Sequence, residues 1–414
     1  MTPEQVEIES VGARGDGMAA GPLYVPFTLP GERVSVRAHG ERAELVEVSR
    51  PSPDRVAPPC PHFLVCGGCA LQHWAHPPYL AWKAELVRQA LARERLETEI
   101  LPPFAAPPAS RRRLALHARP GSPDAARLGY KIRGSWTLVD IAVCPIADPR
   151  LQAAIPALKR LAAPFLEHPR SAPTLHVTWT ATGLDVDVTG VERRTCALSA
   201  DARMRAAEAA QAMDAARVTM SGEVVYGARQ PVVRLGPAAV ALPPGAFLQA
   251  VPQAEDAMAS FALDALSGMK RIADLYCGVG TFSFRLAQAA PVHAVDGDAA
   301  AIAALKAAVG TAPGLKGITA EARDLARRPL SAEELNRFDA AVFDPPRAGA
   351  LDQAREMARS KLTRVVGVSC NPATFARDAR VLADAGFRLE RVLPVDQFLW
   401  SPHVELVGVL TRER

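Results

Sequence analysis

The C-terminal part of the chain alternates short apolar segments with helical ones, and this pattern constrains the fold more than any other feature. From about Val251 onward, five segments read as buried strands: RIADLYC, PVHAVDGD, FDAAVFDPP, LTRVVGVSC and HVELVGVL. Helical periodicity lies between them, as in FSFRLAQAA and AAIAALKAAV. Buried strands connected by helices indicate a parallel, doubly wound sheet. We therefore predict an α/β fold with a Rossmann-like sheet over residues 251–414.

The remaining sequence divides into two further regions. Residues 1–50 contain short alternating runs separated by glycine turns, which predict a small β-barrel. An oligonucleotide-binding barrel is one form, and an uncommitted β-module is the alternative. A proline-rich linker begins at Pro51, and residues 51–250 mix strands with alanine-rich helices, including a helical stretch over about 79–96 and another over 200–216. We expect three domains: 1–50, 51–250 and 251–414.

Composition excludes some classes of protein. The 414 residues are 49% hydrophobic, enough for several cores, but no stretch approaches the ~18 apolar residues of a membrane span. The polar N-terminus does not resemble a secretory signal, so we expect a cytoplasmic protein whose seven cysteines are reduced. The net charge of +4 is compatible with an RNA partner but does not require one.

A glycine-containing loop, DLYCGVGTF, follows the first predicted strand of the C-terminal region. Gly278 and Gly280 allow the backbone to approach a ligand closely, and ligands bind at the carboxyl ends of such strands. Asp296 ends the next strand and is a candidate acceptor for ribose hydroxyls, and Asp324 could face an adenine amino group. Because G-x-G-x-x-G is absent, the loop favours S-adenosylmethionine over NAD. A simple strand–turn–helix corner is the structural alternative.

Three further polar residues occupy strand ends of the same sheet. Asp344 ends a strand in FDPPR, and Cys370 ends the next one in SCNP; they are the fourth and fifth strands when the one before Asp324 is counted. Glu405 begins the last strand in an otherwise apolar run. Cys370 is a candidate nucleophile or a buried structural cysteine. Glu405 is a candidate general base with a raised pKa or a satisfied strand-end glutamate, and Asp344 could bind a nucleobase or position the cysteine.

Methylation at carbon 5 of uracil would need both a nucleophile and a base. A thiolate that adds to carbon 6 makes carbon 5 nucleophilic enough to attack a sulfonium methyl group. A base must then remove the proton from carbon 5 so that the cysteine can leave. Cys370 and Glu405 suit these two roles.

Four cysteines form a candidate metal site: Cys60, Cys66, Cys69 and Cys144. Three of them share one loop with C-x5-C-x2-C spacing, and Gly67-Gly68 allows that loop to turn tightly. Zinc sites usually contain two pairs of closely spaced cysteines, whereas this chain has one such pair and a distant fourth cysteine. The spacing therefore favours an iron–sulfur cluster, with zinc or no metal as alternatives. The other two cysteines are interpreted as structural: Cys196 and Cys277.

Taken together, these motifs resemble the RNA uracil-5 methyltransferases, specifically the RumA-type enzymes of 23S ribosomal RNA. The resemblance covers most of the chain. VGARGDGMAAGPLYVPFTLPGERV is similar to the family's TRAM barrel, and PSPDRVAPPCPHFLVCGGCALQHW to its cluster loop, with Cys144 completing a [4Fe-4S] site. SCNP is present unchanged, and the family's base matches Glu405.

The resemblance also implies residue roles and partners. Gln249, in GAFLQ, would contact the cofactor, as would Tyr276 and Thr281. Two departures stand out, since Val251 replaces a usual asparagine and Asp296 a usual glutamate. The implied partner is RNA, in particular 23S ribosomal RNA, bound by a monomer.

Alternative interpretations remain for the basic segment and for the substrate. Residues 111–113, Arg-Arg-Arg, resemble a basic strand of the family and are read as phosphate contacts, or as a solvated charge run. A tRNA uracil-5 methyltransferase is the nearest rival, and an RNA cytosine-5 or amino-group methyltransferase is more distant. A non-catalytic iron–sulfur protein that binds RNA is the rival from another class.

Overall fold

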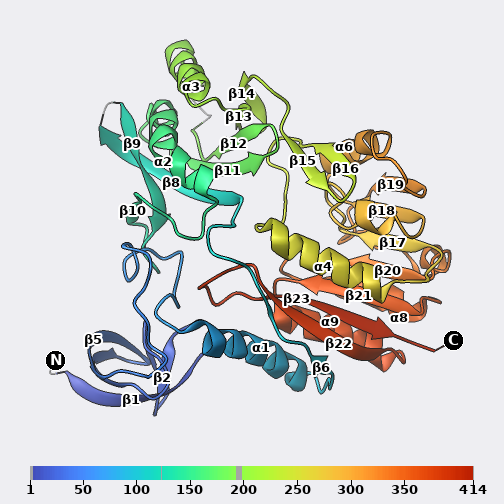
Figure 1. Ribbon diagram of the computed structural model, residues 1–414, viewed down its shortest axis with the longest axis horizontal. Coiled ribbons are helices and arrows are strands. Elements are labelled where there is room, and N and C mark those ends of the chain that lie inside the picture. The colour runs from blue at the N-terminus through green and yellow to red at the C-terminus, as the bar shows by residue number, and fades with distance from the viewer. Residues whose placement is uncertain (1–2, 123, 193–197, 414) are drawn as a thin grey trace.

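The computed structural model describes residues 3–122, 124–192 and 198–413, so the predicted structural cysteine Cys196 lies outside the described residues (Figure 1). The first five strands form a closed barrel in the order β1-β2-β3-β5-β4. Their apolar side chains, including Ile8 and Val34, fill its interior. The strands are β1 (Glu4–Val11), β2 (Gly17–Ala19), β3 (Leu23–Val25), β4 (Arg33–His39) and β5 (Arg42–Arg50).

Helix α1 (His76–Arg93) runs from the barrel to the C-terminal sheet (Figure 1). It begins three residues before the predicted start because prolines are tolerated in a first helical turn, where their missing N–H groups have no helical partner. Tyr79 and Trp82 are buried on its inner side, where they join a core with Leu71 and Leu399. The helix therefore connects segments that are more than 300 positions apart in the sequence.

A seven-stranded sheet with the order β10-β9-β8-β11-β12-β13-β14 forms the middle of the molecule. Helices α2 (Pro149–Ala162) and α3 (Ala200–Ala212) and the 3-10 helix η1 (Ala163–Leu166) share one core with it. Helix α3 ends four residues before the predicted end. The strands are β8 (Arg113–Ser122), β9 (Ala125–Lys131), β10 (Leu138–Asp140), β11 (Thr174–Thr180), β12 (Gly183–Thr189), β13 (Arg217–Met220) and β14 (Glu223–Gly227).

The C-terminal sheet has the strand order β19-β18-β17-β20-β21-β23-β22-β6. Strands β19 to β21 are parallel, which confirms the predicted doubly wound α/β fold, whereas β23 is antiparallel to both neighbours. The strands are β6 (Glu99–Ile100), β17 (Ile272–Leu275), β18 (Val292–Asp296), β19 (Ile318–Ala322), β20 (Ala340–Phe343), β21 (Arg364–Ser369), β22 (Arg388–Asp396) and β23 (Glu405–Thr411), and β7 (Phe104–Ala105) also pairs with β22. From β17, the chain adds β18 and β19 on one side of the sheet and then returns to add β20 and β21 on the other side. Ligands bind at the switch point between β17 and β20.

The helices that flank this sheet are α4 (Pro252–Ala265), α5 (Ser283–Leu286), α6 (Ala299–Val309), α7 (Ala332–Leu335), α8 (Leu351–Arg359) and α9 (Pro372–Asp384). Helix α5 is only one turn long, although FSFRLAQAA predicts a longer helix, and hydrogen-bonded turns continue the segment to Ala290, directly before Pro291. A separate hairpin, β15 (Val232–Leu235) and β16 (Ala238–Ala241), packs against α6.

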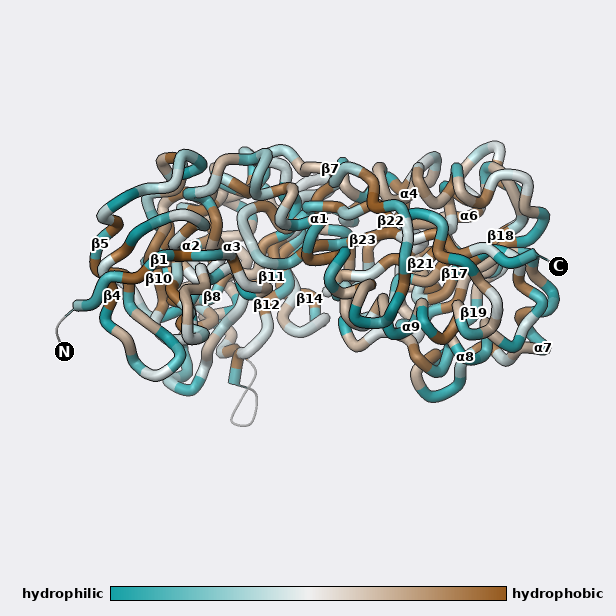
Figure 2. Tube along the Cα trace, turned by 90° about the horizontal axis from the view of Figure 1, so that it is seen from below, coloured by the Kyte–Doolittle hydropathy of each residue, from teal (hydrophilic) through white to brown (hydrophobic). Residues whose placement is uncertain are grey.

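The molecule is broad and flat, with its two termini at opposite sides (Figures 1 and 2). Apolar residues gather along the strands, and hydrophilic residues predominate in the outer loops (Figure 2). None of the helices within the described residues is long and apolar enough to cross a membrane.

Candidate active site and cysteine pocket

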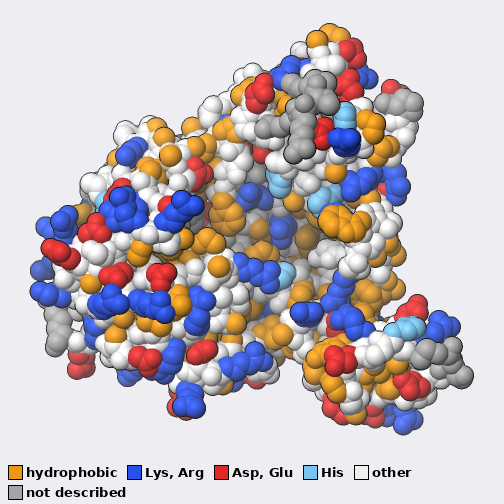
Figure 3. Space-filling model, turned by 180° about the vertical axis from the view of Figure 1, so that it is seen from behind, with side chains coloured by type: hydrophobic (Ala, Val, Ile, Leu, Met, Phe, Trp, Pro, Cys, Tyr) orange, Lys and Arg blue, Asp and Glu red, His pale blue; other side chains and the backbone are white. Residues whose placement is uncertain are grey.

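A cavity of about 730 Å3 opens at the carboxyl ends of β17, β18, β20 and β21. Residues Arg111, Arg113 and His176 from the central sheet region form its opposite wall. Figure 3 shows a hollow between the lobes of the molecule, with basic and apolar side chains at its surface. The predicted site residues that line the cavity are Gln249, Tyr276, Gly278, Thr281, Asp296, Asp324, Asp344, Cys370 and Glu405.

Gly280 does not line the cavity but shapes the loop above it. Its φ of +99° is unfavourable for residues with a side chain, and a Cβ there would lie 2.6 Å from the Phe284 ring. Gly278 also has a positive φ, of +54°, and its N–H donates to Asp296 Oδ2 at 2.8 Å. The two glycines therefore bring the loop backbone against the tip of β18.

The acidic strand ends are already partly engaged by the backbone. Asp296 Oδ1 accepts a hydrogen bond from Asp298 N at 2.8 Å, and Asp324 Oδ1 accepts one from Ala326 N at 3.0 Å. A carboxylate offers about four acceptor positions, so both side chains retain capacity for a ligand's hydroxyl or amino groups. An open glycine loop beside two such carboxylates suits the adenosine part of S-adenosylmethionine.

Four side chains form a hydrogen-bonded chain across the cavity floor. Gln249 Nε2 donates to Asp344 Oδ2 at 2.9 Å, and Gln397 Nε2 donates both to Gln249 Oε1 at 2.8 Å and to Glu405 Oε2 at 2.7 Å. The backbone N–H of Ala250 donates to Gln397 Oε1 at 3.2 Å. Because that N–H can only donate, it fixes the orientation of the Gln397 amide. The two linked glutamine amides therefore donate an N–H group at each end, one to the carboxylate of Asp344 and one to that of Glu405.

Gln397 was not predicted from the sequence. It lies in the loop between β22 and β23, where neither periodicity nor a motif distinguishes it from other loop glutamines. The polar pair Asp396-Gln397, at the end of the apolar run VLPV, is the only signal that could have indicated it.

Burial changes the acid–base properties of the three candidate catalytic groups. Desolvation raises the pKa of Asp344 to about 7, and the hydrogen bond from Gln249 opposes this rise. Desolvation and the nearby charge of Asp344 raise the pKa of Glu405 to about 8, against the hydrogen bond from Gln397. Burial also raises the pKa of the Cys370 thiol, and the two carboxylates raise it further. Nucleophilic chemistry at Cys370 thus requires prior removal of its proton.

Helix α1 holds both ends of the β22–β23 loop (residues 397–404). Lys83 Nζ donates to Asp396 Oδ1 at 3.0 Å, and both side chains are fully buried. Lys83 also donates to the carbonyl oxygen of His403, two residues before Glu405. Burial lowers the pKa of Lys83, while Asp396 opposes this change. One ammonium group therefore links both ends of the loop that carries Gln397.

The cysteine-containing segment contacts the middle of the same loop. Ala70 N and Leu71 N both donate to the carbonyl oxygen of Trp400, at 2.8 and 3.0 Å. Trp400 N donates to Tyr79 Oη at 2.8 Å, and Trp400 has a φ of +59°, which is uncommon for a bulky residue. These contacts hold the loop in a conformation that its own sequence does not favour.

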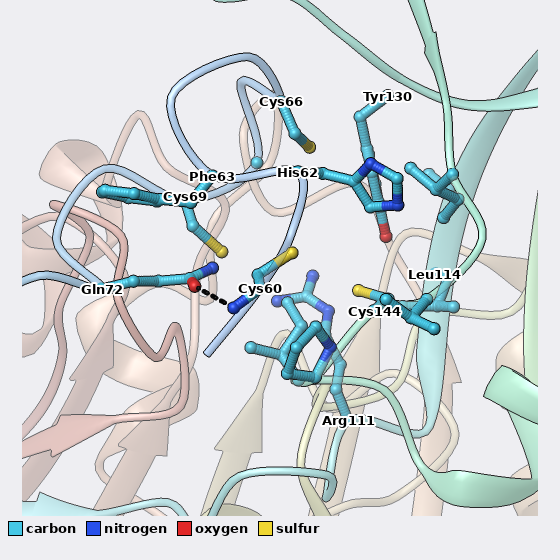
Figure 4. Close-up of a pocket in the computed structure, with 16 residues that line it drawn as sticks. Cys60, His62, Phe63, Cys66, Cys69, Gln72, Arg111, Leu114, Tyr130 and Cys144 are labelled. Atoms are coloured by element: carbon cyan, nitrogen blue, oxygen red, sulfur yellow. Dashed lines mark hydrogen bonds between the residues drawn. The ribbon is translucent and has the colours of Figure 1, made fainter. Parts of the chain in front are cut away.

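The four predicted metal ligands, Cys60, Cys66, Cys69 and Cys144, line a second cavity of about 160 Å3. Their sulfur atoms point toward a common space (Figure 4). Burial raises the pKa of Cys69 to about 12, and the three other cysteines, which lie nearby, raise it further. Gln72 Oε1 accepts a hydrogen bond from Cys60 N at 3.2 Å (Figure 4). Arg111 lines both this pocket and the larger cavity.

Within the described ranges, no group of three or more cysteine, histidine or acidic side chains is arranged to hold a single metal ion. A tetrahedral zinc site needs its sulfur atoms close together around one ion. A cubane cluster carries its four thiolates on separate corners, farther apart and around a larger volume. The structure thus brings the four predicted ligands to one pocket, and the kind of metal group they would hold stays a prediction.

The basic segment at residues 111–113 has a mixed environment. Arg112 is buried, forms an ion pair with Glu255 and donates to the backbone carbonyl of Gln249, so neither predicted role describes it. Arg113 Nη1 donates to Leu248 O at 2.7 Å and lines the cavity together with Arg111. Only the outer two arginines therefore face the space where a substrate would lie.

A doubly wound sheet with the antiparallel strand β23, and a glycine loop with carboxylates at its switch point, defines a class I S-adenosylmethionine-dependent methyltransferase. The family described as tRNA (uracil-5-)-methyltransferase matches residues 240–414. An uncharacterized RNA methyltransferase of Caulobacter vibrioides is 65% identical over 99% of this chain and 100% of that one. The 23S rRNA (uracil(1939)-C(5))-methyltransferase RlmD of Chromohalobacter salexigens is 32% identical over 100% of this chain and 90% of its own.

The chain belongs to the RNA uracil-5 methyltransferases, which methylate RNA with S-adenosylmethionine. Its fold is also that of a solved structure, the Pyrococcus abyssi tRNA (uracil-54, C5)-methyltransferase in complex with S-adenosyl-L-homocysteine. That structure superposes with a TM-score of 0.75 at 24% identity, and the match covers 99% of this chain and 100% of that one. The predicted family and enzyme class are thereby confirmed.

Proposed function

We propose that this enzyme methylates carbon 5 of a uridine in 23S ribosomal RNA through a covalent adduct of Cys370. The observation that supports it most is the shared cavity of Cys370, Asp344 and Glu405 beside the glycine loop. The ribosomal substrate rests on the relative from Chromohalobacter salexigens, which is similar over this entire chain.

In the proposed reaction, Cys370 gives its proton to solvent water, and the thiolate Sγ forms a bond to carbon 6 of the uracil. The electrons of the carbon 5–carbon 6 double bond move to carbon 5 and the carbon 4 carbonyl. S-adenosylmethionine supplies the methyl group that carbon 5 accepts. Glu405 then removes the proton from carbon 5, the double bond re-forms, and Cys370 leaves as a thiolate.

The raised pKa of Glu405 suits this role. A base with a pKa of about 8 is strong enough to accept a carbon-bound proton and is still partly ionised near neutral pH. Asp344, whose pKa is raised to about 7, lies on the same cavity wall and would hydrogen-bond the polar edge of the uracil or orient Cys370. We assign Gln397 as a positioning residue, because its amide holds the Glu405 carboxylate.

The remaining cavity residues would hold the cofactor. In this proposal, Asp296 contacts the ribose and Asp324 the adenine, while the glycine loop approaches the amino acid part of the cofactor. The residues assigned to cofactor binding are Gln249, Tyr276, Gly278, Gly280, Thr281, Asp296, Asp324 and Asp344.

We also propose that Cys60, Cys66, Cys69 and Cys144 hold a [4Fe-4S] cluster. The support is their common cavity and the C-x5-C-x2-C spacing of the first three cysteines. Such a cluster would cross-link the linker loop to the segment after β10, and through Ala70 and Leu71 it would support the β22–β23 loop.

The substrate is tested with labelled S-adenosylmethionine and separate pools of unmodified ribosomal and transfer RNA. Nucleosides from each digest are identified by mass spectrometry. Labelled 5-methyluridine in 23S RNA supports the proposal. Label confined to transfer RNA would keep the chemistry and overturn the ribosomal substrate.

A further inference from the structure

A solvent-exposed tryptophan lies beside the cysteine pocket, outside the catalytic cavity. Trp136 is 79% exposed and sits in the loop between β9 and β10. Lys131 Nζ lies 3.9 Å from the centroid of its ring system. An aromatic surface beside a cation matches a nucleic acid, which offers a nucleobase and a phosphate side by side.

The loop that carries Trp136 is held by its own hydrogen bonds. Ile132 N donates to Thr137 O at 2.9 Å, and Ser135 N donates to Ile132 O at 3.0 Å. The Ser135 hydroxyl donates to Thr137 Oγ1 at 3.1 Å. An ordered loop presents the ring with little loss of conformational entropy on binding.

The barrel and the cysteine loop both support this loop from behind. Gly67 N donates to Lys131 O at 2.9 Å, and a Cβ at Gly67 would lie only 2.6 Å from that oxygen, so only glycine allows this approach. Arg133 forms an ion pair with Asp16 of the barrel. The cysteine loop and the β9–β10 loop border a groove of about 530 Å3 that Trp136 also lines.

A second aromatic–cation pair marks the catalytic cavity itself. Phe247 is 67% exposed, lines that cavity, and has the Arg113 guanidinium 5.3 Å from its ring centroid. Single exposed apolar residues are ordinary on protein surfaces. Trp136 differs from such single exposed residues, because it has an adjacent cation, lies in an ordered loop and lines a groove.

We propose that Trp136 and Lys131 form a stacking site for an unpaired nucleobase of the RNA substrate, separate from the uridine that is methylated. The base stacks on the exposed indole, and Lys131 approaches the neighbouring phosphate. This site deepens the proposed function, on which it rests for its ligand. It also gives the cysteine loop a task in RNA binding, since Gly67 fixes the backbone of Lys131.

The test compares Trp136→Ala with wild-type holoenzyme in RNA binding and steady-state kinetics. Loss of one stacked base should raise Kd and KM for the RNA about tenfold and leave kcat at saturating RNA unchanged. Trp136→Phe keeps an aromatic face and should retain most of the affinity. Met204→Ala, which removes another exposed apolar side chain on α3, should change neither constant.

Photocrosslinking identifies the contact directly. A single-stranded oligouridylate containing 5-iodouridine should crosslink to Trp136, as mapped by mass spectrometry, whereas the same sequence in a duplex should not. Unchanged Kd in Trp136→Ala together with no crosslink at Trp136 would overturn the stacking site. An inactive wild-type enzyme that still crosslinks at Trp136 would instead contradict the proposed function alone.

Discussion

The Gln397 side-chain amide lies 2.7 Å from Glu405 Oε2, and the same nitrogen lies 2.8 Å from Gln249 Oε1. Both protons of that nitrogen are thereby used, and the amide oxygen accepts from Ala250 N. Glu405 is thus held by a neighbour that cannot rotate without losing a hydrogen bond. The candidate base, the candidate cofactor contact Gln249 and Asp344 form one connected unit.

Replacing Gln397 with methionine should shift the pH dependence of methyl transfer upward. The hydrogen bond from Gln397 lowers the pKa of Glu405, so its loss raises that pKa further. Because the base must be ionised, the pH at which activity rises should increase. The rate at neutral pH should therefore fall about tenfold. Single-turnover rates across pH measure both effects.

Gln353→Met is the matched control for this variant. Gln353 is equally buried but bonds to the backbone of Leu330, and it does not line the catalytic cavity. This variant should lose stability without moving the pH profile. A profile that stays unchanged in Gln397→Met would refute the positioning role.

Asp344→Asn should shift the same profile in the opposite direction. The charge of Asp344 raises the pKa of Glu405, so a neutral asparagine lets Glu405 ionise at lower pH. Its side-chain oxygen can still accept the hydrogen bond from Gln249. The readout is the midpoint of the profile, since the maximum rate also reflects any contact between Asp344 and the uracil. A midpoint at higher pH would contradict the coupling.

Lys83→Met should destabilise the protein by about 3 kcal/mol, because it leaves the buried Asp396 carboxylate without its partner. Urea unfolding measures the change. The control is Arg355→Ala, which removes an exposed ion pair with Asp352 and should cost less than about 1 kcal/mol. Equal losses in the two variants would show that the Lys83 pair does not hold the β22–β23 loop.

Anaerobically purified protein should contain about four iron and four sulfide per chain. Cys66→Ser should lower both contents and the melting temperature, because Cys66 lies in the loop that supports β9 and Trp400. Cys277→Ser should keep the full iron content, since Cys277 lies outside the cysteine pocket. Stoichiometric zinc with no iron in the wild type would rule out the cluster.

Much of the fold followed from local sequence. Parallel strands place their carboxyl ends on one edge, so Asp344 and Cys370 were expected to meet, and the structure brings both to one cavity. Their chemical roles stay predictions. The class of fold is confirmed, but periodicity reveals neither the antiparallel direction of β23 nor the short length of α5.

Gln397 could not be predicted for a different reason. Its position depends on contacts between the β22–β23 loop and α1, in particular the Lys83–Asp396 pair, which joins residues 313 positions apart. The burial of Arg112 likewise depends on Glu255, far along the chain. Long-range ion pairs of this kind leave no periodic pattern in the sequence.

The covalent mechanism is tested most directly by trapping the adduct with Glu405→Gln. This variant should still form the bond from Cys370 to carbon 6 and transfer the methyl group, but it should not remove the carbon 5 proton. The account predicts a denaturation-resistant protein–RNA complex that carries labelled methyl, with the crosslink mapped to Cys370 and absent in Cys370→Ala. Free 5-methyluridine formed at the wild-type rate by Cys370→Ala would contradict it.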